Sequence, residues 1–278
     1  MKLTLTACAS VVAVVTITQM AIGLAAPMAG QWVNHPTRGL PRTADGKPDL
    51  SAPTPRTRDG QVDLSGIWLS ERDPKGTLGG IEGIVAPRYM INIMTDLKPG
   101  EVPFQPWAEA LYKQRGANLF RDNPMIRCLP AGVPRLDAYT HPYKIVQTPE
   151  LVVVLYESMT MFRQIFVDGR ALPEDPEPSW LGYSVGKWDG DVLAVETAGF
   201  NDKTWLDGSG HPHSEAMRVT ERFKRVNVGR MEVEIVIDDP KAYTKPLKYT
   251  QPQVLLPDTE LLEYICAENA KPIGQGRH

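Results

Sequence analysis

The sequence predicts a mainly β protein: an antiparallel barrel of about 8–10 strands, with a proline-rich N-terminal arm and one short helix. From residue 143 onward, apolar and polar residues alternate in short runs, which is the period of half-buried strands. Short turns join these runs, as at Asp189-Gly-Asp191, where an Asp-Gly pair separates two β-prone segments. A barrel is favoured over a sandwich because sequential hairpins close into a barrel without long crossovers.

Residues 1–26 have the composition of a secretory signal peptide. Lys2 gives a short positive start, an apolar run covers residues 11–24, and Ala25-Ala26 offers small residues for cleavage. We therefore expect a periplasmic or secreted protein. No later run reaches the ~18 apolar residues of a membrane-spanning helix, so no membrane span is expected.

The formal charge of −3 is spread without a basic block. Nucleic acid and anionic membranes are therefore poor candidate partners. The sequence also contains no glycine-rich nucleotide fingerprint, no Walker loop and no haem-attachment motif. No cofactor is favoured, although a divalent metal stays open.

Residues 27–66 form the expected extended arm, because prolines recur there without apolar periodicity. Residues 42–51 (RTADGKPDLS) are nearly repeated as residues 56–65 (RTRDGQVDLS), and each copy contains an Asp-Gly turn signal. The arm either folds back onto its own barrel or reaches a neighbour in a homo-oligomer. The barrel domain is expected over residues 67–268, followed by a tail at 269–278.

One helix is predicted near residues 106–116. Pro106 suits the first helical position, Trp107, Ala110 and Leu111 follow at helical spacing, and Gly116 ends the pattern. The expected strands are 64–68, 143–147, 151–157, 161–167, 182–188, 192–197, 215–225, 230–237, 247–249 and 259–266.

Cys128 and Cys266 remain once the signal peptide is removed. Exported compartments permit disulfides, so we expect these two residues to pair. Such a bond would contribute roughly 4–5 kcal/mol in the chain-entropy model. The alternative is two buried free thiols.

The segment 208–215 (GSGHPHSE) is the strongest candidate site. In an extended backbone, His211, His213 and Glu215 would project to one side. Two imidazoles and a carboxylate suit a Zn, Fe or Mn site with an open position. They equally suit metal-free proton transfer, or an ordered loop in which the histidines bond to the backbone.

Two charges lie in register with apolar residues of predicted strands, Arg163 and Glu221. A buried charge is costly unless it is paired, so they form either an internal salt bridge or a polar ligand site. In the loop before the histidines, Phe200 and Trp205 are candidate apolar walls for a ligand. Asn201 and Asp207 are the candidate polar contacts of the same loop.

Several motifs together resemble a widespread family of uncharacterised exported bacterial proteins. The resemblance covers roughly residues 40–268 and implies a lipocalin-like barrel, but no reaction. The motifs are residues 163–169 (RQIFVDG), 181–191 (LGYSVGKWDGD), 199–205 (GFNDKTW), 211–215 (HPHSE) and 220–223 (TERF).

The leading functional hypothesis is cofactor-free acid/base chemistry on a small hydrophobic or aromatic molecule, as in a lyase, isomerase or hydrolase. His211 or His213 would move the proton, Glu215 or Glu221 would orient the histidine, and Arg163 would hold a polar substituent. One alternative is a non-catalytic, lipocalin-type ligand carrier. Another is a metal-dependent hydrolase or oxygenase that uses His211, His213 and Glu215.

Overall fold

The computed structural model describes residues 35–77, 85–98 and 100–269. The predicted signal peptide, the start of the arm and the tail after residue 269 lie outside the described residues. Within the described part, no helix is long and apolar enough to cross a membrane.

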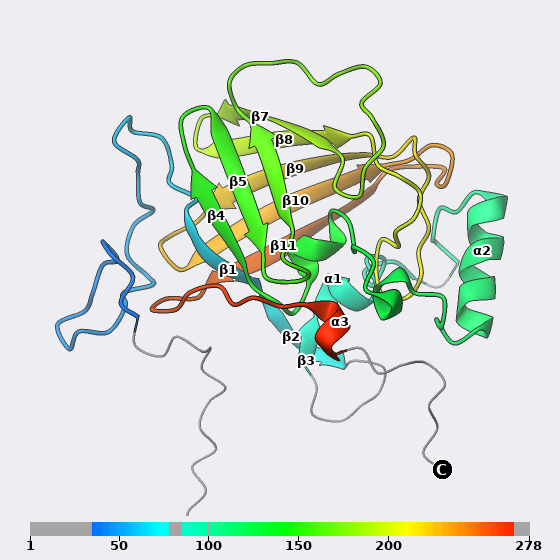
Figure 1. The fold of residues 1–278 in the computed structure, drawn as a ribbon, viewed down its shortest axis with the longest axis horizontal. Helices are drawn as coiled ribbons and strands as arrows, with labels where there is room; N and C mark the ends of the chain where they lie inside the picture. The colour runs from blue at the N-terminus through cyan, green and yellow to red at the C-terminus, as the bar shows by residue number, and fades with distance from the viewer. Residues whose placement is uncertain (1–34, 78–84, 99, 270–278) are drawn as a thin grey trace, which may run out of the picture.

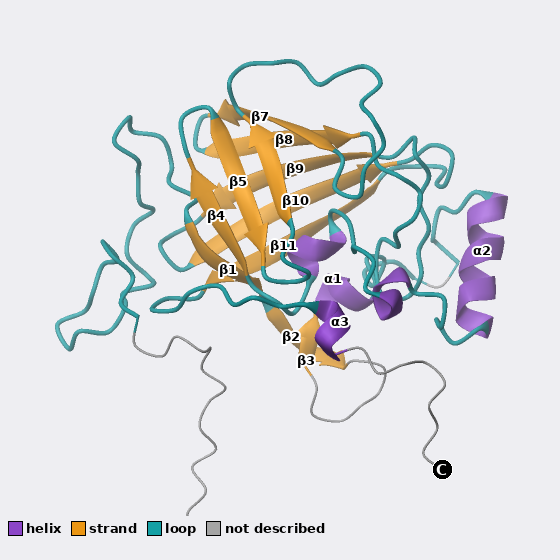
Figure 2. Cartoon of the chain, in the orientation of Figure 1, coloured by secondary structure: helices purple, strands orange, loops and turns teal. Residues whose placement is uncertain are grey.

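Nine strands form a closed barrel in the order β1-β11-β10-β9-β8-β7-β6-β5-β4, and β4 pairs back onto β1 (Figures 1 and 2). The predicted lipocalin-like barrel is therefore confirmed. Its strands are β1 (Gly66–Ser70), β4 (Tyr143–Gln147), β5 (Leu151–Tyr156), β6 (Phe162–Phe166), β7 (Tyr183–Asp189), β8 (Val192–Ala198), β9 (Arg218–Arg225), β10 (Arg230–Asp238) and β11 (Leu247–Leu255).

Smaller elements gather at one end of this barrel (Figure 1). The predicted helix near 106–116 is α2 (Pro106–Ala117). The others are a two-stranded sheet of β2 (Arg72–Thr77) and β3 (Val85–Pro87), short helices α1 (Arg88–Ile91) and α3 (Cys266–Asn269), and 3₁₀ turns η1 (Pro124–Arg127) and η2 (Arg135–Ala138).

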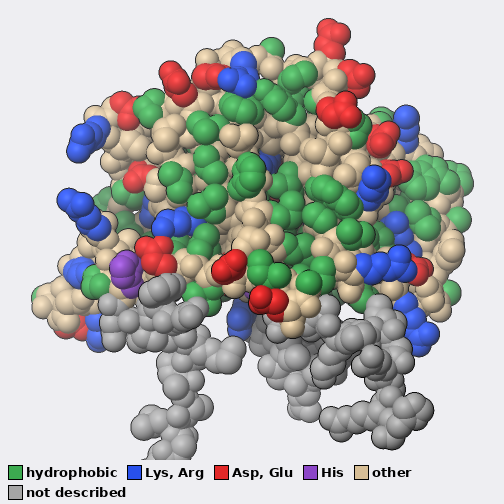
Figure 3. All heavy atoms as spheres, in the orientation of Figure 1, with side chains coloured by type: hydrophobic (Ala, Val, Ile, Leu, Met, Phe, Trp, Pro, Cys, Tyr) green, Lys and Arg blue, Asp and Glu red, His purple; other side chains and the backbone are tan. Residues whose placement is uncertain are grey.

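The alternation of apolar residues positions the core as the sequence indicates. In β10, Met231, Val233, Ile235 and Ile237 are completely buried, while the residues between them are partly exposed. This is the pattern of strands with one solvent-exposed face and one buried face. The outer face drawn in Figure 3 mixes acidic, basic and apolar side chains without a large patch of one sign.

Two details of the predicted barrel are wrong. β6 and β7 pair in parallel, because residues 167–182 cross over between them instead of forming a hairpin. Residues 259–266 do not form a strand; Tyr264 makes only an isolated bridge to Ser158. The β1–β4 pairing has already closed the barrel, so this segment finds no free edge to extend.

The arm folds onto its own barrel through two similar clips, defined as residues 42–51 and 56–65. In the first clip, Arg42 makes a two-pronged ion pair with Asp258, beyond the end of β11 (2.6 and 3.0 Å). In the second clip, Arg56 does the same with Asp191 in the β7–β8 turn (2.8 and 3.0 Å). The two copies of the repeated sequence thus attach the arm to the barrel by the same kind of arginine–aspartate ion pair.

The predicted disulfide is present. Cys128 and Cys266 are bonded, with their Cα atoms 5.5 Å apart and a sequence separation of 138. The bond ties α3 to the loop that follows η1, at the end of the barrel where the short helices gather.

Candidate active site

Asp207 and His211 form a buried pair in the loop between β8 and β9. The His211 Nδ1 atom lies 2.6 Å from Asp207 Oδ2, and the backbone N–H of His211 donates to Asp207 Oδ1 (3.2 Å). The backbone N–H of Ile93 donates to Asp207 Oδ2 (2.8 Å). The carboxylate is thereby fixed from two sides, and it fixes the imidazole in turn.

This geometry assigns the ring nitrogens of His211. An ionised carboxylate only accepts hydrogen bonds, so Nδ1 carries the hydrogen in the Asp207–His211 contact. In the neutral ring, Nε2 is then the unprotonated nitrogen. No hydrogen bond occupies Nε2 among the described residues.

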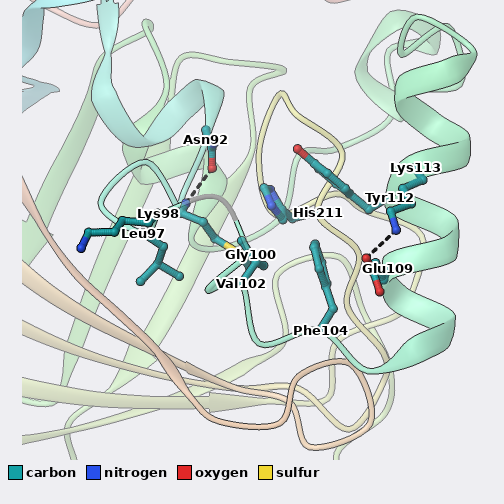
Figure 4. A pocket seen from close by; sticks show the side chains of 11 residues that line it. Asn92, Leu97, Lys98, Gly100, Val102, Phe104, Glu109, Tyr112, Lys113 and His211 are labelled. Carbon is teal, nitrogen blue, oxygen red and sulfur yellow. Dashed lines mark hydrogen bonds and ion pairs between the residues drawn. The ribbon is translucent and has the colours of Figure 1, made fainter.

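His211 lines a half-open pocket of about 500 Å³ (Figure 4). Its ring stacks with Tyr112 of α2, at 4.5 Å between ring centroids, and with Phe104, at 5.6 Å. The remaining lining residues are apolar Met94, Leu97 and Val102, polar Asn92, charged Lys98, Glu109 and Lys113, and Gly100. The lining thus mixes apolar and charged groups around one histidine, and a concave pocket of this kind suits a small organic molecule with apolar and polar parts.

α2 is held against the histidine loop by Arg115. Its Nη1 atom donates to the carbonyl oxygen of Gly210 (2.9 Å), and its guanidinium lies 4.6 Å from the Trp205 ring centroid. Burial lowers the pKa of Arg115 to about 10. Gly210 has a φ of +86°, which favours glycine, and a Cβ atom there would lie only 3.3 Å from the Arg115 side chain.

His213 is buried and bonded at both ring nitrogens. Nε2 lies 2.6 Å from Thr204 Oγ1, and Nδ1 lies 3.2 Å from the carbonyl oxygen of Ser214. Burial lowers the pKa of His213, which favours the neutral ring. His213 therefore stabilises the loop through these hydrogen bonds, as the structural alternative expected. Of the two histidines, only His211 lines the pocket.

The expected shared face of His211, His213 and Glu215 is not formed. Residues 210–217 make a loop with a turn, and β9 begins only at Arg218, so the two-residue alternation does not apply. Glu215 is exposed, while both histidines are buried. Within the described ranges, no three His, Cys, Asp or Glu side chains lie together as metal ligands would.

The other residues predicted to bind substrate pack inside the loop instead. Phe200 is buried edge-on to His213, with ring centroids 6.5 Å apart, and Trp205 is covered by Arg115. Asn201 accepts the backbone N–H of Lys203 (3.1 Å) and so stabilises a turn. None of the three lines the pocket beside His211.

Glu221 and Arg163 lie inside the barrel and bind each other. The Arg163 guanidinium donates to both carboxylate oxygens of Glu221, to Ser184 Oγ (3.0 Å) and to Thr197 Oγ1 (2.8 Å). The alternative of an internal salt bridge therefore describes these residues. Neither the orienting role expected of Glu221 nor a free Arg163 matches this arrangement.

A second carboxyl group joins this pair, and sequence reasoning missed it. Asp137 Oδ2 lies 3.9 Å from Arg163 Nη1, and Tyr156 donates to Asp137 Oδ1 (2.8 Å). Burial, followed by repulsion from Glu221, raises the pKa of Asp137 to about 7. Asp137 comes from η2, where no strand periodicity marks it as inward-facing.

Tyr112 and Phe104 were also missed. Tyr112 follows Ala108 by four residues, which places both on one helical face, and Ala108 is the buried residue of α2. That spacing was a usable signal for Tyr112. Phe104 lies in an irregular segment, where no periodicity in the sequence marks it as a pocket residue.

Comparison of the chain with protein-family models, with curated proteins and with solved structures finds no match. The resemblance to an exported bacterial family stays a prediction.

Proposed function

We propose that this protein is an enzyme that performs cofactor-free acid/base chemistry on a small hydrophobic or aromatic molecule in the pocket between α2 and the histidine loop. The supporting observation is the Asp207–His211 pair, whose imidazole lines that pocket. A histidine held by a buried carboxylate is a recurring general base in enzymes.

His211 is the proton carrier in this proposal. Its Nε2 takes a proton from a C–H, an O–H or a water molecule in the pocket, and the buried Asp207 stabilises the resulting imidazolium. The same nitrogen returns the proton to the product, so no net acid or base is consumed. Asp207 takes the orienting role that was expected of Glu215 or Glu221.

The pocket lining suggests how the substrate is held. Phe104 and Tyr112 offer ring surfaces for an apolar or aromatic group. Lys98 lines the same pocket and would stabilise negative charge that develops when a proton is removed, whereas Lys113 is paired there with Glu109 (2.5 Å). Lyase, isomerase and hydrolase reactions all share this first step.

A lipocalin-type carrier would hold its ligand in the barrel interior. That interior contains the buried side chains of Trp68, Tyr143 and Arg163, together with the acidic partners of Arg163. These side chains favour the pocket beside His211 over the barrel interior as the place for an organic molecule.

Turnover by the purified full chain tests the proposal. Small-molecule extract from cells of the source is incubated with the wild type, His211→Gln and Asp207→Asn, and compared by untargeted mass spectrometry. His35→Gln is the matched control, because the His35 side chain is 58% exposed and lies outside the pocket.

We expect the wild type and the His35 variant to convert at least one compound into a product. His211→Gln should slow this conversion by about 10²–10⁴-fold, the usual contribution of general acid/base catalysis, and Asp207→Asn should slow it as well. Equal conversion by His211→Gln would overturn the proposal. Retention of a compound without any product would identify a carrier instead.

A further inference from the structure

Arg135 is a buried cation without an acidic partner. It is the first residue of η2, and only 4% of its surface is exposed. Within the described ranges its one hydrogen bond is long, from Nη1 to Asn123 Oδ1 (3.3 Å), and its buried Nε atom has no acceptor there. Among the described residues, no carboxylate oxygen lies within 4.0 Å of this guanidinium.

The other well-buried arginines show what is missing. Arg163 has the carboxylate of Glu221. Arg225 lies over the ring of Trp68, at 4.8 Å. It also donates to four backbone carbonyl oxygens, those of Asp63, Ser65, Asn227 and Val228. Arg135 has neither a carboxylate partner nor such a set of carbonyl acceptors, although a buried charge is unfavourable unless it is compensated.

The surroundings of Arg135 are a built site and not a loose surface. Asn123 is itself fixed, because its Oδ1 also accepts the backbone N–H of Met125 (3.2 Å). Tyr139 and Asp207 are near enough to act electrostatically on Arg135, but Asp207 is already bonded to His211. The guanidinium therefore keeps unused donors beside the barrel end.

We propose that Arg135 is the centre of an oxyanion-binding site at the end of the barrel covered by η2. The planar guanidinium offers parallel N–H donors that match a carboxylate or an inorganic oxyanion. A bound anion would compensate the buried charge and occupy the Nε donor. The site does not depend on the proposed chemistry at His211.

Thermal unfolding of the full chain with added anions tests this site. Sodium benzoate represents an organic carboxylate and sodium phosphate an inorganic oxyanion, each compared with sodium chloride at equal ionic strength. The variant is Arg135→Gln. The control is Arg121→Gln, which removes the same charge from an exposed side chain of the neighbouring loop.

We expect benzoate or phosphate to raise the Tm of the wild type and of Arg121→Gln in a saturable way, and to leave Arg135→Gln unshifted. A response to benzoate alone identifies an organic acid site, and a response to phosphate alone an inorganic one. No saturable shift beyond that of chloride in the wild type, or a shift that persists in Arg135→Gln, overturns the proposal.

Calorimetric titration keeps the test decisive if Arg135→Gln does not fold. The wild type should bind about one anion per chain. Arg135→Lys keeps the charge but loses the paired donors, and should bind about 10–100-fold more weakly. Equal affinity in the two proteins contradicts the proposal.

Discussion

Two carboxyl groups, Asp137 and Glu221, share one guanidinium inside the barrel. Arg163 bonds directly to Glu221, whereas Asp137 Oδ2 lies 3.9 Å from Arg163 Nη1 and has no hydrogen-bond partner in the part of the chain that the structure describes. A single positive charge cannot fully compensate two buried negative charges. Burial and repulsion from Glu221 therefore raise the pKa of Asp137 to about 7.

This raised pKa predicts how stability depends on pH. The pKa of Asp137 is raised from 3.8 to about 7, so the folded state binds more protons than the unfolded state between these values. The stabilisation by protonated Asp137 is present at low pH and is lost as the pH rises toward 7. Urea unfolding at pH 5 to 8 should show a decline on the order of 1–3 kcal/mol that Asp137→Asn lacks.

A second buried group, His213, also makes stability depend on pH in this range. Burial lowers the pKa of His213, so its contribution is lost in the opposite direction, as the pH falls below about 6.5. His213 is present in both proteins, and the difference between them isolates Asp137. Parallel profiles for the wild type and Asp137→Asn would contradict the assignment.

Removing one member of the internal ion pair should be costly. Glu221→Gln leaves the buried Arg163 charge inadequately compensated, and we expect a loss of about 3–5 kcal/mol in the free energy of unfolding. The exposed pair of Arg222 and Asp189 is the matched comparison, since Arg222→Gln should cost at most about 1 kcal/mol. Similar losses in the two variants would show that burial of the pair does not matter.

The sequence revealed only part of this cluster. Arg163 and Glu221 could be predicted as inward-facing because each interrupts an apolar face at period two. Asp137 enters the barrel from a 3₁₀ turn, which has no such period. The Asp207–His211 contact depends on the path of a loop, and alternation says nothing about loops.

At the scale of elements, the two arm clips depend on exposed ion pairs. The Arg42–Asp258 pair is less exposed (31% and 25%) than the Arg56–Asp191 pair (49% and 62%). Arg42→Ala and Arg56→Ala should each lower the free energy of unfolding by no more than about 1 kcal/mol, and Arg42→Ala should have the larger effect. Hydrogen exchange should accelerate in the affected clip and leave β10 unchanged.

Lys47→Ala is the control for this prediction. Among the described residues, Lys47 forms an ion pair only with Asp45 of its own clip, and its side chain is 79% exposed. Unchanged exchange in Arg42→Ala would mean that other contacts hold the first clip, such as the hydrogen bond from Gly229 to the carbonyl oxygen of Leu50 (2.8 Å).

The repeat itself was visible in the sequence, but its role was not. Two similar ten-residue segments with Asp-Gly turns were evident. Their acidic partners lie 216 and 135 residues further along the chain, one beyond the end of β11 and one in the β7–β8 turn. Only the tertiary arrangement shows that the arm docks on its own barrel.

At the scale of the whole molecule, alternation predicted the strands, and the short turns between them predicted a closed β-barrel, which the structure has. Neither pattern predicted the parallel β6–β7 pairing, since a hairpin and a crossover can join the same two strands. The candidate site depends even more on contacts between residues that are distant in sequence. It brings together His211, Tyr112 of α2 and Phe104, which are separated in sequence and meet only at the end of the barrel.

The proposed chemistry depends on one property of His211, an unprotonated Nε2 at the pocket. Nitrogen NMR of histidine-labelled full chain at pH 8.5 measures this directly, with the His211 signals assigned from His211→Gln. We expect hydrogen on Nδ1 and none on Nε2 in the wild type, and a loss of this preference in Asp207→Asn. Hydrogen on Nε2 in the wild type would contradict the role of Asp207–His211 as the base.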